Sequence, residues 1–294
     1  MNPKINQTVL MSGANYFGDS QAINVLMDAS LPVDLASAKA EHAQIQSALE
    51  SAGLKVIKID APAGLQDGVY VANWALIRSG KALMSRLPNT RRPEEAYALK
   101  AIKNAGLEPL ILPSQVERFS GQGDSLPCGD IVFTQSPFRT TIKAHQYLKD
   151  WLGFSEVIAL ETEPARDASG QAIINAVTGW PDSPTYDIDL ALAILKWPGK
   201  TQKGLIAYCP EVFKPASQKL LADLNAVDKI TVSKTEALES FALNLVSTGE
   251  TVVMNAGAPN FQAALESDGL KTIALNLPEL RKGGGSIRCT TLTL

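Results

Sequence analysis

Histidine and cysteine are scarce in this sequence, with two histidines and three cysteines among 294 residues. Cys128, Cys209 and Cys289 form neither a CxxC pair nor a cysteine–histidine cluster. Three widely spaced cysteines indicate free thiols, and they suggest neither a disulfide framework nor a structural zinc site. The two histidines limit acid–base catalysis, because histidine is the side chain that ordinarily titrates near neutral pH.

An excess of charge and a long apolar run are also missing. The net charge is −3, and lysine and arginine are scattered along the chain without forming a basic segment. This pattern argues against nucleic acid and anionic membranes as partners. No apolar run approaches the length of a membrane span, and residues 1–7 lack the apolar core of a signal peptide. We therefore expect a cytoplasmic protein.

Hydrophobic residues make up 45% of the chain, enough for one large globular domain or two small ones. The pattern predicts a strand at 8–11, a long helix at 36–52 that stops at Gly53, and a strand at 54–59. A hairpin is then expected at 69–86, turning at Ser79-Gly80, followed by a helix at 93–104 and a strand at 109–112.

The order of hairpin, helix and strand recurs along the chain. The later copies are predicted at 124–135, 140–152 and 157–160; at 189–195, 205–209, 215–224 and 229–232; and at 241–246, 251–255, 260–266 and 271–276. A strand at 286–294 would open a fifth unit that the N-terminal segment completes. Repeats of this kind predict one α/β domain over residues 1–294, with five units around a central axial pocket. The alternative is an ordinary α/β sheet without such symmetry.

Cys289 follows Gly283-Gly284-Gly285, whose flexible backbone would deliver the thiol to the exposed start of the last predicted strand. A thiol there is a candidate nucleophile. Its ordinary pKa of about 8.5 leaves it protonated at neutral pH unless a cation or helix terminus is nearby. Arg288 is expected on the opposite face of the strand. The alternative is a small buried hydrophobic residue, a common role of free cysteine.

Four aspartates, Asp67, Asp124, Asp187 and Asp189, stand near predicted strand starts, where carboxylates could bind a guanidinium through paired hydrogen bonds. Capping of strands or turns is the alternative for each. In a strand, Asp187 and Asp189 would share one face. Two like charges there are costly unless a cation or a proton lies between them.

The remaining polar candidates have ordinary structural explanations. His42 and His145 fall in predicted helices among polar neighbours, so we expect both on solvated helix faces. Asn73 interrupts an apolar strand predicted at 71–75. A buried amide needs hydrogen-bond partners, so Asn73 is either a structural hydrogen-bonding residue or a substrate ligand.

Together these segments resemble the guanidine-modifying superfamily with the pentein fold, a five-bladed α/β propeller. The likeness covers nearly the whole chain and is nearest the dimethylarginine dimethylaminohydrolase-like and amidinotransferase-like branch. The segments that carry it are Asp-Gly-Val-Tyr-Val-Ala-Asn-Trp-Ala at 67–75, Phe-Ser-Gly-Gln-Gly-Asp at 119–124, Gly-Ser-Ile-Arg-Cys at 285–289, and the softer match Phe-Ala-Leu-Asn at 241–244. The resemblance implies that a cysteine attacks a guanidinium carbon and forms a covalent thiouronium intermediate, while a histidine transfers protons.

Carried over by position, the resemblance makes Cys289 the nucleophile and Asp189 the catalytic-site aspartate that stands two residues after the family's histidine, where it positions the substrate. Two positions depart from the family pattern. Asp187 stands where the catalytic histidine is expected, and Ser120 replaces a glutamate. Asn73 occupies a position that is acidic in several branches. The resemblance implies these substrate-binding residues: Asp67, Asn73, Ser120, Asp124 and Arg139.

The resemblance therefore implies a hydrolase of C–N bonds in a small guanidine, ureido or amidine compound. Asp187 takes the place of histidine in proton transfer, and the covalent chemistry requires neither a metal nor an organic cofactor. The substrate is expected to be cationic and arginine-like, and a homodimer is left open. One alternative is a catalytically silent relative that binds a small cationic ligand or a protein partner. A weaker alternative is an amidinotransferase.

Overall fold

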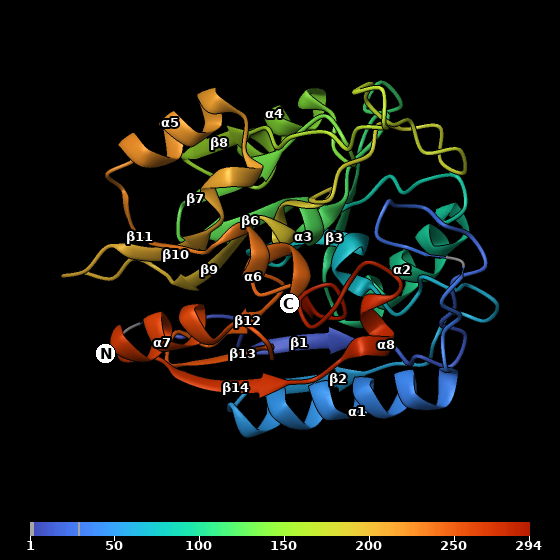
Figure 1. Cartoon of the computed structure of the whole chain (residues 1–294), viewed down its shortest axis with the longest axis horizontal. Helices are drawn as coiled ribbons and strands as arrows, with labels where there is room; N and C mark the ends of the chain where they lie inside the picture. The colour runs from blue at the N-terminus through green and yellow to red at the C-terminus, as the bar shows by residue number, and fades with distance from the viewer. Residues whose placement is uncertain (1–2, 29) are drawn as a thin grey trace.

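Five small sheets of the same design make up the fold of the computed structural model, which describes residues 3–28 and 30–294 (Figure 1). Each sheet has three strands. The middle strand pairs with one neighbour in antiparallel fashion and with the other in parallel fashion. The repeated pairing scheme is compatible with five repeating units, as the sequence predicts.

The sheets are formed by strands that are close in sequence, except in one sheet that joins the two ends of the chain. In spatial order they are β15 (Leu292–Thr293), β1 (Thr8–Met11) and β2 (Lys55–Lys58); β3 (Ala75–Arg78), β4 (Lys81–Met84) and β5 (Glu108–Ile111); β6 (Ser125–Cys128), β7 (Ile131–Gln135) and β8 (Glu156–Leu160); β11 (Val227–Thr231), β10 (Gly204–Tyr208) and β9 (Leu192–Lys196); β12 (Val246–Ser247), β13 (Thr251–Asn255) and β14 (Lys271–Leu275).

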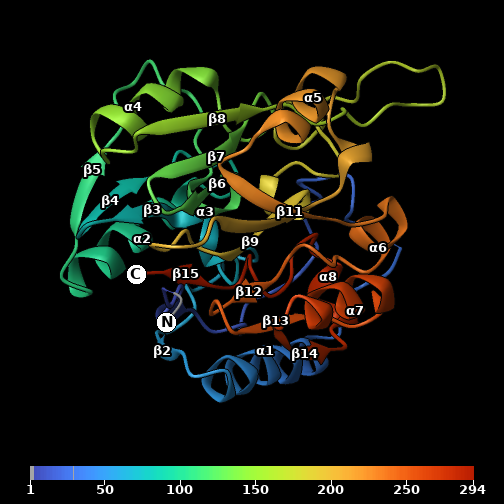
Figure 2. The same cartoon turned by 90° about the vertical axis from the view of Figure 1, so that its left-hand side faces the viewer.

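A helix connects the two parallel strands of every sheet, because parallel neighbours need a long crossover. These helices are α1 (Leu35–Ser51), α2 (Arg92–Asn104), α4 (His145–Asp150), α5 (Pro215–Asp223) and α7 (Pro259–Ser267). Both views place α1 on one outer side of the molecule and α4 and α5 on the opposite side (Figure 2). Apolar clusters fill the space between sheets and helices.

Shorter helical segments stand at the starts of several sheets or between units. They are α3 (Gly121–Asp124), α6 (Lys234–Glu239) and α8 (Pro278–Arg281), with the 3-10 helices η1 (Val71–Trp74), η2 (Ile142–Ala144), η3 (Ile188–Leu190) and η4 (Pro210–Val212). No helix among residues 3–28 and 30–294 is long and apolar enough to cross a membrane.

The two ends of the chain meet in one sheet, where β1 lies between β15 and β2. In the antiparallel pair, Val9 faces Thr293 and Leu10 faces Leu292. In the parallel pair, Val9 faces Val56. The C-terminal strand thus completes a sheet whose other two strands come from the first sixty residues.

Local sequence signals explain the elements that were predicted well. The Asp34 carboxylate caps α1 by accepting from the Ala36 N–H at 3.0 Å, and Gly53 with φ 91° ends that helical region. Ser79 and Gly80 have positive φ values of 52° and 77° at the turn between β3 and β4. The predicted strand at 8–11 is confirmed in full.

Several predicted strands are wrong. Residues 71–74 form the 3-10 helix η1, so Asn73 lies in a helical turn. The strand expected at 286–294 is reduced to β15, and turns precede it. The strand expected at 241–246 contributes only Val246, and α6 was missed. The helix expected at 140–152 is divided between η2 and α4.

Glu41 fixes the segment that leads into the C-terminal glycines. Its carboxylate, on α1, accepts hydrogen bonds from the Glu279 N–H at 2.9 Å and the Leu280 N–H at 2.8 Å, at the beginning of α8. The Glu41 residue is 6% exposed. A buried carboxylate that binds two unpaired backbone donors anchors this helix end.

We expect Glu41→Gln to lower the free energy of unfolding by about 1–3 kcal/mol, because one of the two buried N–H groups loses its acceptor. Urea denaturation followed by circular dichroism measures the change. Glu50→Gln is the matched control, since Glu50 is exposed on the same helix and its carboxylate accepts from the exposed Gln46 side chain. Equal effects of the two substitutions would contradict this role of Glu41.

Candidate active site

Cys289 lies in a buried turn between the glycine segment and β15, and its residue is 3% exposed. The expected placement on an exposed strand edge is therefore wrong. Asn244 organises the turn: its Oδ1 accepts from the Ser286 N–H at 3.1 Å and the Arg288 N–H at 3.0 Å. The Asn244 Nδ2 donates to the Cys289 Sγ at 3.1 Å. One amide side chain thus shapes the backbone and contacts the thiol.

The glycines before Cys289 are required by close packing. A Cβ on Gly285 would lie 2.9 Å from the Cβ of Cys289 and 2.7 Å from the Tyr70 ring. The Tyr70 hydroxyl donates to the Leu280 carbonyl at 2.6 Å, and the Tyr186 hydroxyl donates to the Gly284 carbonyl at 2.8 Å. Two buried tyrosines therefore hold the segment in place beside the thiol.

Asp189 contacts the candidate nucleophile directly. The Cys289 thiol donates to the Asp189 Oδ2 with a sulfur–oxygen distance of 3.3 Å. Asp189 lies in η3, and Asp187 lies in extended backbone just before that helix. The prediction that Asp187 and Asp189 share one strand face is therefore wrong, because the chain passes from extended backbone at Asp187 into the 3-10 helix η3 at Asp189.

Asp187 is held in place by the side chain of Asn73. The Asn73 Nδ2 donates to the Asp187 Oδ2 at 2.7 Å and to the Ser120 Oγ at 2.9 Å. A Cβ on Gly123 would lie 2.4 Å from the Asn73 Nδ2 and 2.7 Å from the Asp187 Oδ2, so only glycine fits beside this contact. None of the ion pairs among the described residues involves Asp187.

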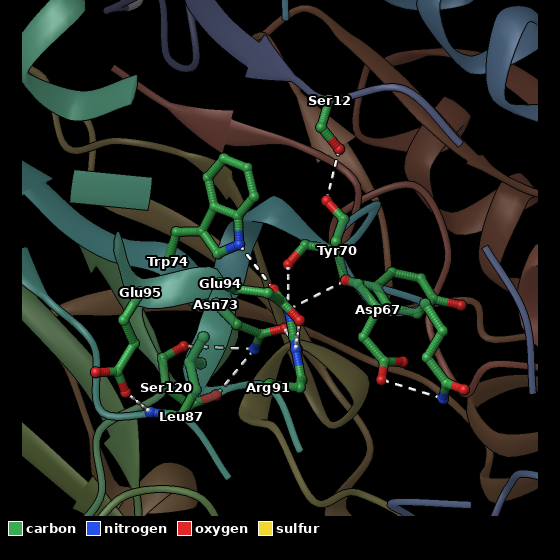
Figure 3. A network of polar contacts seen from close by, with 12 residues as sticks. Ser12, Asp67, Tyr70, Asn73, Trp74, Leu87, Arg91, Glu94, Glu95 and Ser120 are labelled. Carbon is green, nitrogen blue, oxygen red and sulfur yellow. Dashed lines mark hydrogen bonds and ion pairs between the residues drawn. The ribbon is translucent and has the colours of Figure 1, made fainter. Parts of the chain in front are cut away.

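Arg91 lies at the centre of the polar network behind Asn73 (Figure 3). Its Nη1 donates to the Asn73 Oδ1 at 2.8 Å, and its Nε and Nη2 each donate to Glu94 at 2.8 Å. Its Nη2 also donates to the backbone carbonyls of Asp67 and Tyr70. The paired guanidinium and carboxylate satisfy each other's charge and fix the orientation of the Asn73 amide toward Asp187.

Asp124 joins the same cluster through the backbone. Its Oδ1 accepts from the Ile188 N–H at 3.0 Å, between the two other aspartates of the cluster in sequence. Asp124, Asp187 and Asp189 are each 1% exposed or less. The structure thus brings together Cys289, Asn73, Ser120 and these three aspartates, which the sequence spreads over more than two hundred residues.

Four buried carboxylates keep one oxygen without a hydrogen-bond partner among the described residues. These atoms are the Oδ1 of Asp67, the Oδ2 of Asp124, the Oδ1 of Asp187 and the Oδ1 of Asp189. Burial raises the pKa of all four groups, to about 6 for Asp67. The charge of Asp187 further raises the pKa values of Asp124 and Asp189. The cluster is suited to a ligand that brings positive charge and N–H donors.

The thiol is also held in its protonated form. Burial raises the pKa of Cys289 well above its ordinary value, and the carboxylates of Asp189 and Asp187 raise it further. The hydrogen bonds from Ser286 and Asn244 act in the opposite direction. Arg288 is buried nearby and donates to the Gln122 Oε1 at 2.8 Å; burial lowers its pKa, although the charges of Asp189 and Cys289 act in the opposite direction. A cationic ligand would relieve the excess of negative charge and favour the thiolate.

Arg139 and Asp67 lie at the edge of this cluster. The Arg139 Nη2 donates to the Ile23 carbonyl at 2.7 Å, and its guanidinium lies 4.5 Å from the centre of the Tyr186 ring. Its charge lowers the pKa values of Asp187 and Asp67, although burial outweighs this effect in both. Both residues are buried.

Comparison with known proteins decides the family. No protein-family model matches the chain. The N(G),N(G)-dimethylarginine dimethylaminohydrolase of Mycobacterium tuberculosis is 32% identical over 285 residues, which cover 97% of this chain and 84% of that protein. The chain belongs to the dimethylarginine dimethylaminohydrolase family. A second relative, the bifunctional arginine dihydrolase/ornithine cyclodeaminase AgrE of Nostoc, is 27% identical over 233 residues, which cover 78% of this chain and 29% of that protein.

Solved structures agree on the fold. The N-terminal domain of ArgZ, a cyanobacterial arginine dihydrolase, matches with a TM-score of 0.82 and 22% identity over 97% of this chain and 96% of that one. A mutant of DDAH from Pseudomonas aeruginosa, complexed with citrulline, matches with a TM-score of 0.73 and 19% identity over 98% of this chain and 99% of that one. The predicted superfamily and the mixed α/β pentein-type fold are confirmed.

Membership of the dimethylarginine dimethylaminohydrolase family confirms the expected class of enzyme, hydrolases that act on guanidino C–N bonds. The roles of the individual residues stay predictions. Asn244 and Arg91 were missed as site residues. The Phe-Ala-Leu-Asn segment at 241–244 carried a signal for Asn244, whereas Arg91 gave none, because its importance comes from the contacts of its guanidinium.

The two histidines lie elsewhere and are not solvated. His42 is 2% exposed and His145 is 8% exposed, so the prediction for both is wrong. Burial lowers both pKa values, that of His42 to about 4. Neither histidine is among the residues that contact Cys289 or Asp187. Within the described part of the chain, no group of three or more histidine, cysteine, aspartate or glutamate residues has the arrangement of a metal site.

Asp67 predicts a dependence of stability on pH. Its pKa is raised to about 6 in the folded protein, so the folded state binds more protons than the unfolded state between about pH 4 and pH 6. Its contribution to stability is therefore present at low pH and is lost as the pH rises through 6. The free energy of unfolding of Asp67→Asn should therefore fall by about 3 kcal/mol less than that of the wild type as the pH rises from about 4 to above 6.

Urea denaturation of both proteins at several pH values between 4 and 7 tests this expectation. Asp228→Asn, an exposed position on β11, is the control. Parallel stability curves for the wild type and Asp67→Asn would show that Asp67 has no raised pKa.

Proposed function

We propose that this protein hydrolyses a guanidino C–N bond of a small, arginine-like compound through a covalent intermediate on Cys289. The observation that carries the proposal is the contact of the Cys289 thiol with Asp189 inside a cluster of buried carboxylates. The relatives named dimethylarginine dimethylaminohydrolase and arginine dihydrolase support a guanidino substrate. The solved complexes with L-arginine and citrulline support a ligand of that size.

The unpartnered oxygens of Asp67, Asp124, Asp187 and Asp189 support a guanidinium ligand. A guanidinium with one substituted nitrogen presents five N–H donors in a plane. Its positive charge complements the negative charge of the carboxylates. Asn73 and Ser120 hold Asp187 in place, and Arg139 would lie close to the bound compound. Binding would also lower the pKa of Cys289, because the added positive charge favours the thiolate.

The reaction begins when the guanidinium enters the cluster and the Cys289 proton passes to Asp189. The Cys289 Sγ then forms a bond to the guanidino carbon. As the C–N bond to the leaving amine breaks, Asp187 donates a proton to the departing nitrogen. Water adds to the carbon of the resulting thiouronium group, and one of its protons goes to Asp187. The C–S bond then breaks, Asp189 returns its proton to the sulfur to regenerate the thiol, and the second proton of the water leaves with the amine as the ureido product is released.

Asp187 can serve as the proton donor because its pKa is raised. An exposed aspartate with a pKa near 4 would be ionised at neutral pH and could not protonate an amine. Burial keeps Asp187 protonated to higher pH, despite the nearby charge of Arg139. The free Oδ1 of Asp187 leaves one oxygen available for the proton transfer.

The proposal includes a single pentein domain over residues 1–294, with five units arranged around a pseudo-fivefold axis. The repeated design of the five sheets supports it. Contacts between β6 and β9 and between β9 and β12 link neighbouring sheets. Asp189, Gln122 and Arg288 line a cavity of about 550 Å³, and neither Cys289 nor Asp187 is among its lining residues. A homodimer and a cytoplasmic location stay predictions.

A catalytically silent relative is the second candidate. The observation that favours it is the replacement of the expected catalytic histidine by Asp187 and of a glutamate of the family pattern by Ser120. Such a protein would bind the same cationic compound in the carboxylate cluster without turnover. A thermal shift with L-arginine or dimethylarginine that is not accompanied by product would support this function over hydrolysis.

We expect Cys289→Ser to lower turnover of the accepted guanidino compound by at least about 1000-fold, because the nucleophile is lost. L-arginine, dimethylarginine and related guanidines serve as substrates, and mass spectrometry after an acid quench detects the adduct on Cys289. Cys209→Ser is the control, since Cys209 is buried in another unit. An absence of both adduct and product across the compounds would overturn the hydrolase proposal, and product formed only with an added amine would indicate transfer.

We also expect the rate of intermediate formation to fall as the pH rises through the raised pKa of Asp187, because the proton donor is then ionised. Asp187→His should shift the pH at which the rate falls, because a histidine with an ordinary pKa of about 6.5 then donates the proton. Asp187→Asn should remove it together with most of the activity. Single-turnover rates measured from about pH 4 to pH 9 provide the test. An unchanged pH profile in Asp187→His would exclude Asp187 as the proton donor.

A further inference from the structure

A second cavity, of about 700 Å³, lies on the side of the molecule formed by α1, α2 and the ends of β1 and β2. Its size falls within the range of small-molecule sites. Leu10, Ile57, Ile59 and Ala101 give it apolar walls. Neither Cys289 nor any member of the carboxylate cluster lines it. We refer to this cavity as the α1–α2 groove.

Positive charge converges on the groove from three elements. Lys39 comes from α1, Lys58 from β2 and Lys100 from α2, and all three line the cavity. None of them takes part in an ion pair among the described residues, and the Lys58 Nζ donates to the neutral Gln46 amide at 3.1 Å. Asp60 is the one carboxylate among the lining residues. The groove thus has an excess of positive charge on a chain whose net charge is −3.

His42 adds a buried polar group to the same wall. It lines the groove, it is 2% exposed, and its Nε2 has no hydrogen-bond partner among the described residues. Burial and the charge of Lys58 lower its pKa to about 4, so the ring is neutral near pH 7. A buried ring nitrogen without a partner costs free energy, and an anion next to the ring would favour its protonation.

Tyr97 of α2 is a further titratable group of the wall. Its hydroxyl donates to the Asp60 carbonyl at 2.6 Å, and burial and the Asp60 charge raise its pKa. It therefore stays neutral near pH 7 and supplies an aromatic surface. Lysines next to an apolar and aromatic surface suit a ligand that has both an apolar organic part and an anionic group.

We propose that the α1–α2 groove binds a small organic molecule that carries a multiply charged oxyanion, as a ligand distinct from the substrate. The lysines from α1, β2 and α2 surround the anionic group, and the organic body lies on Ile57, Ile59 and Tyr97. The proposal does not depend on the hydrolase activity, because the groove contains none of the residues assigned to that reaction. Phosphate and paired carboxylates share this chemistry.

The two histidines make the experiment specific. Imidazole signals of the full chain are recorded by proton–carbon NMR at constant ionic strength, set with sodium chloride, while phenyl phosphate or citrate is added. His42 is assigned from the signal lost in His42→Gln, and His145 serves as the internal control because α4 lies outside the groove. We expect a saturable shift of the His42 signal with one or both compounds and none for His145. The compound that shifts it distinguishes phosphate from carboxylate.

We expect Lys58→Ala/Lys100→Ala to weaken binding at least tenfold. Lys203→Ala/Lys271→Ala removes the same charge from exposed positions outside the groove and should bind as the wild type does. Substitutions at these exposed lysines should leave the fold intact, which the two histidine signals report. Equal shifts at both histidines, unchanged affinity in Lys58→Ala/Lys100→Ala, or no saturable shift with either compound would overturn the proposal. The last outcome is also the one expected if a second copy of the chain covers the groove.

Discussion

The buried ion pair of Arg91 and Glu94 is the interaction on which the candidate site depends. Removing two charges from water is costly, and here the cost is offset because every nitrogen of the guanidinium has an acceptor. One of those acceptors is the Asn73 oxygen, so the Asn73 nitrogen must face Asp187. The position of the proposed proton donor is therefore set by a charge pair that does not itself touch it.

The fold was predictable where local pattern and turn residues agree. The helix after Asp34 and the hairpin at Ser79-Gly80 follow from capping, periodicity and positive-φ positions, and the recurrence of these signals indicated five similar units. The turns around Asn73 and Cys289 were not predictable in this way. They are single helical turns without a periodic pattern, and their conformations are fixed by distant side chains, Arg91 for the first and Asn244 for the second.

The candidate site was predictable in composition but not in geometry. Family likeness located Cys289, Asp187 and Asp189, whereas the expectation of a shared strand face came from a strand that does not form. The prediction that both histidines are solvated was wrong for a related reason. Polar neighbours such as Glu41 indicated a solvated helix face, yet Glu41 is itself buried because it binds the beginning of α8. The sequence shows that a residue is polar, but not whether its hydrogen bonds are made to water or to other protein groups.

The pairing of β1 with β15 also constrains how the chain folds. Val9 and Thr293, which face each other in this pair, are 284 residues apart in the sequence. Closing a flexible loop of that length costs about 5 kcal/mol in chain entropy, from the (3/2)RT ln n relation. Sheets built from neighbouring segments close shorter loops and lose less chain entropy. The sheet that joins the chain ends is therefore expected to form after the others. The turn that holds Cys289, just before β15, would then be among the last parts of the protein to become ordered.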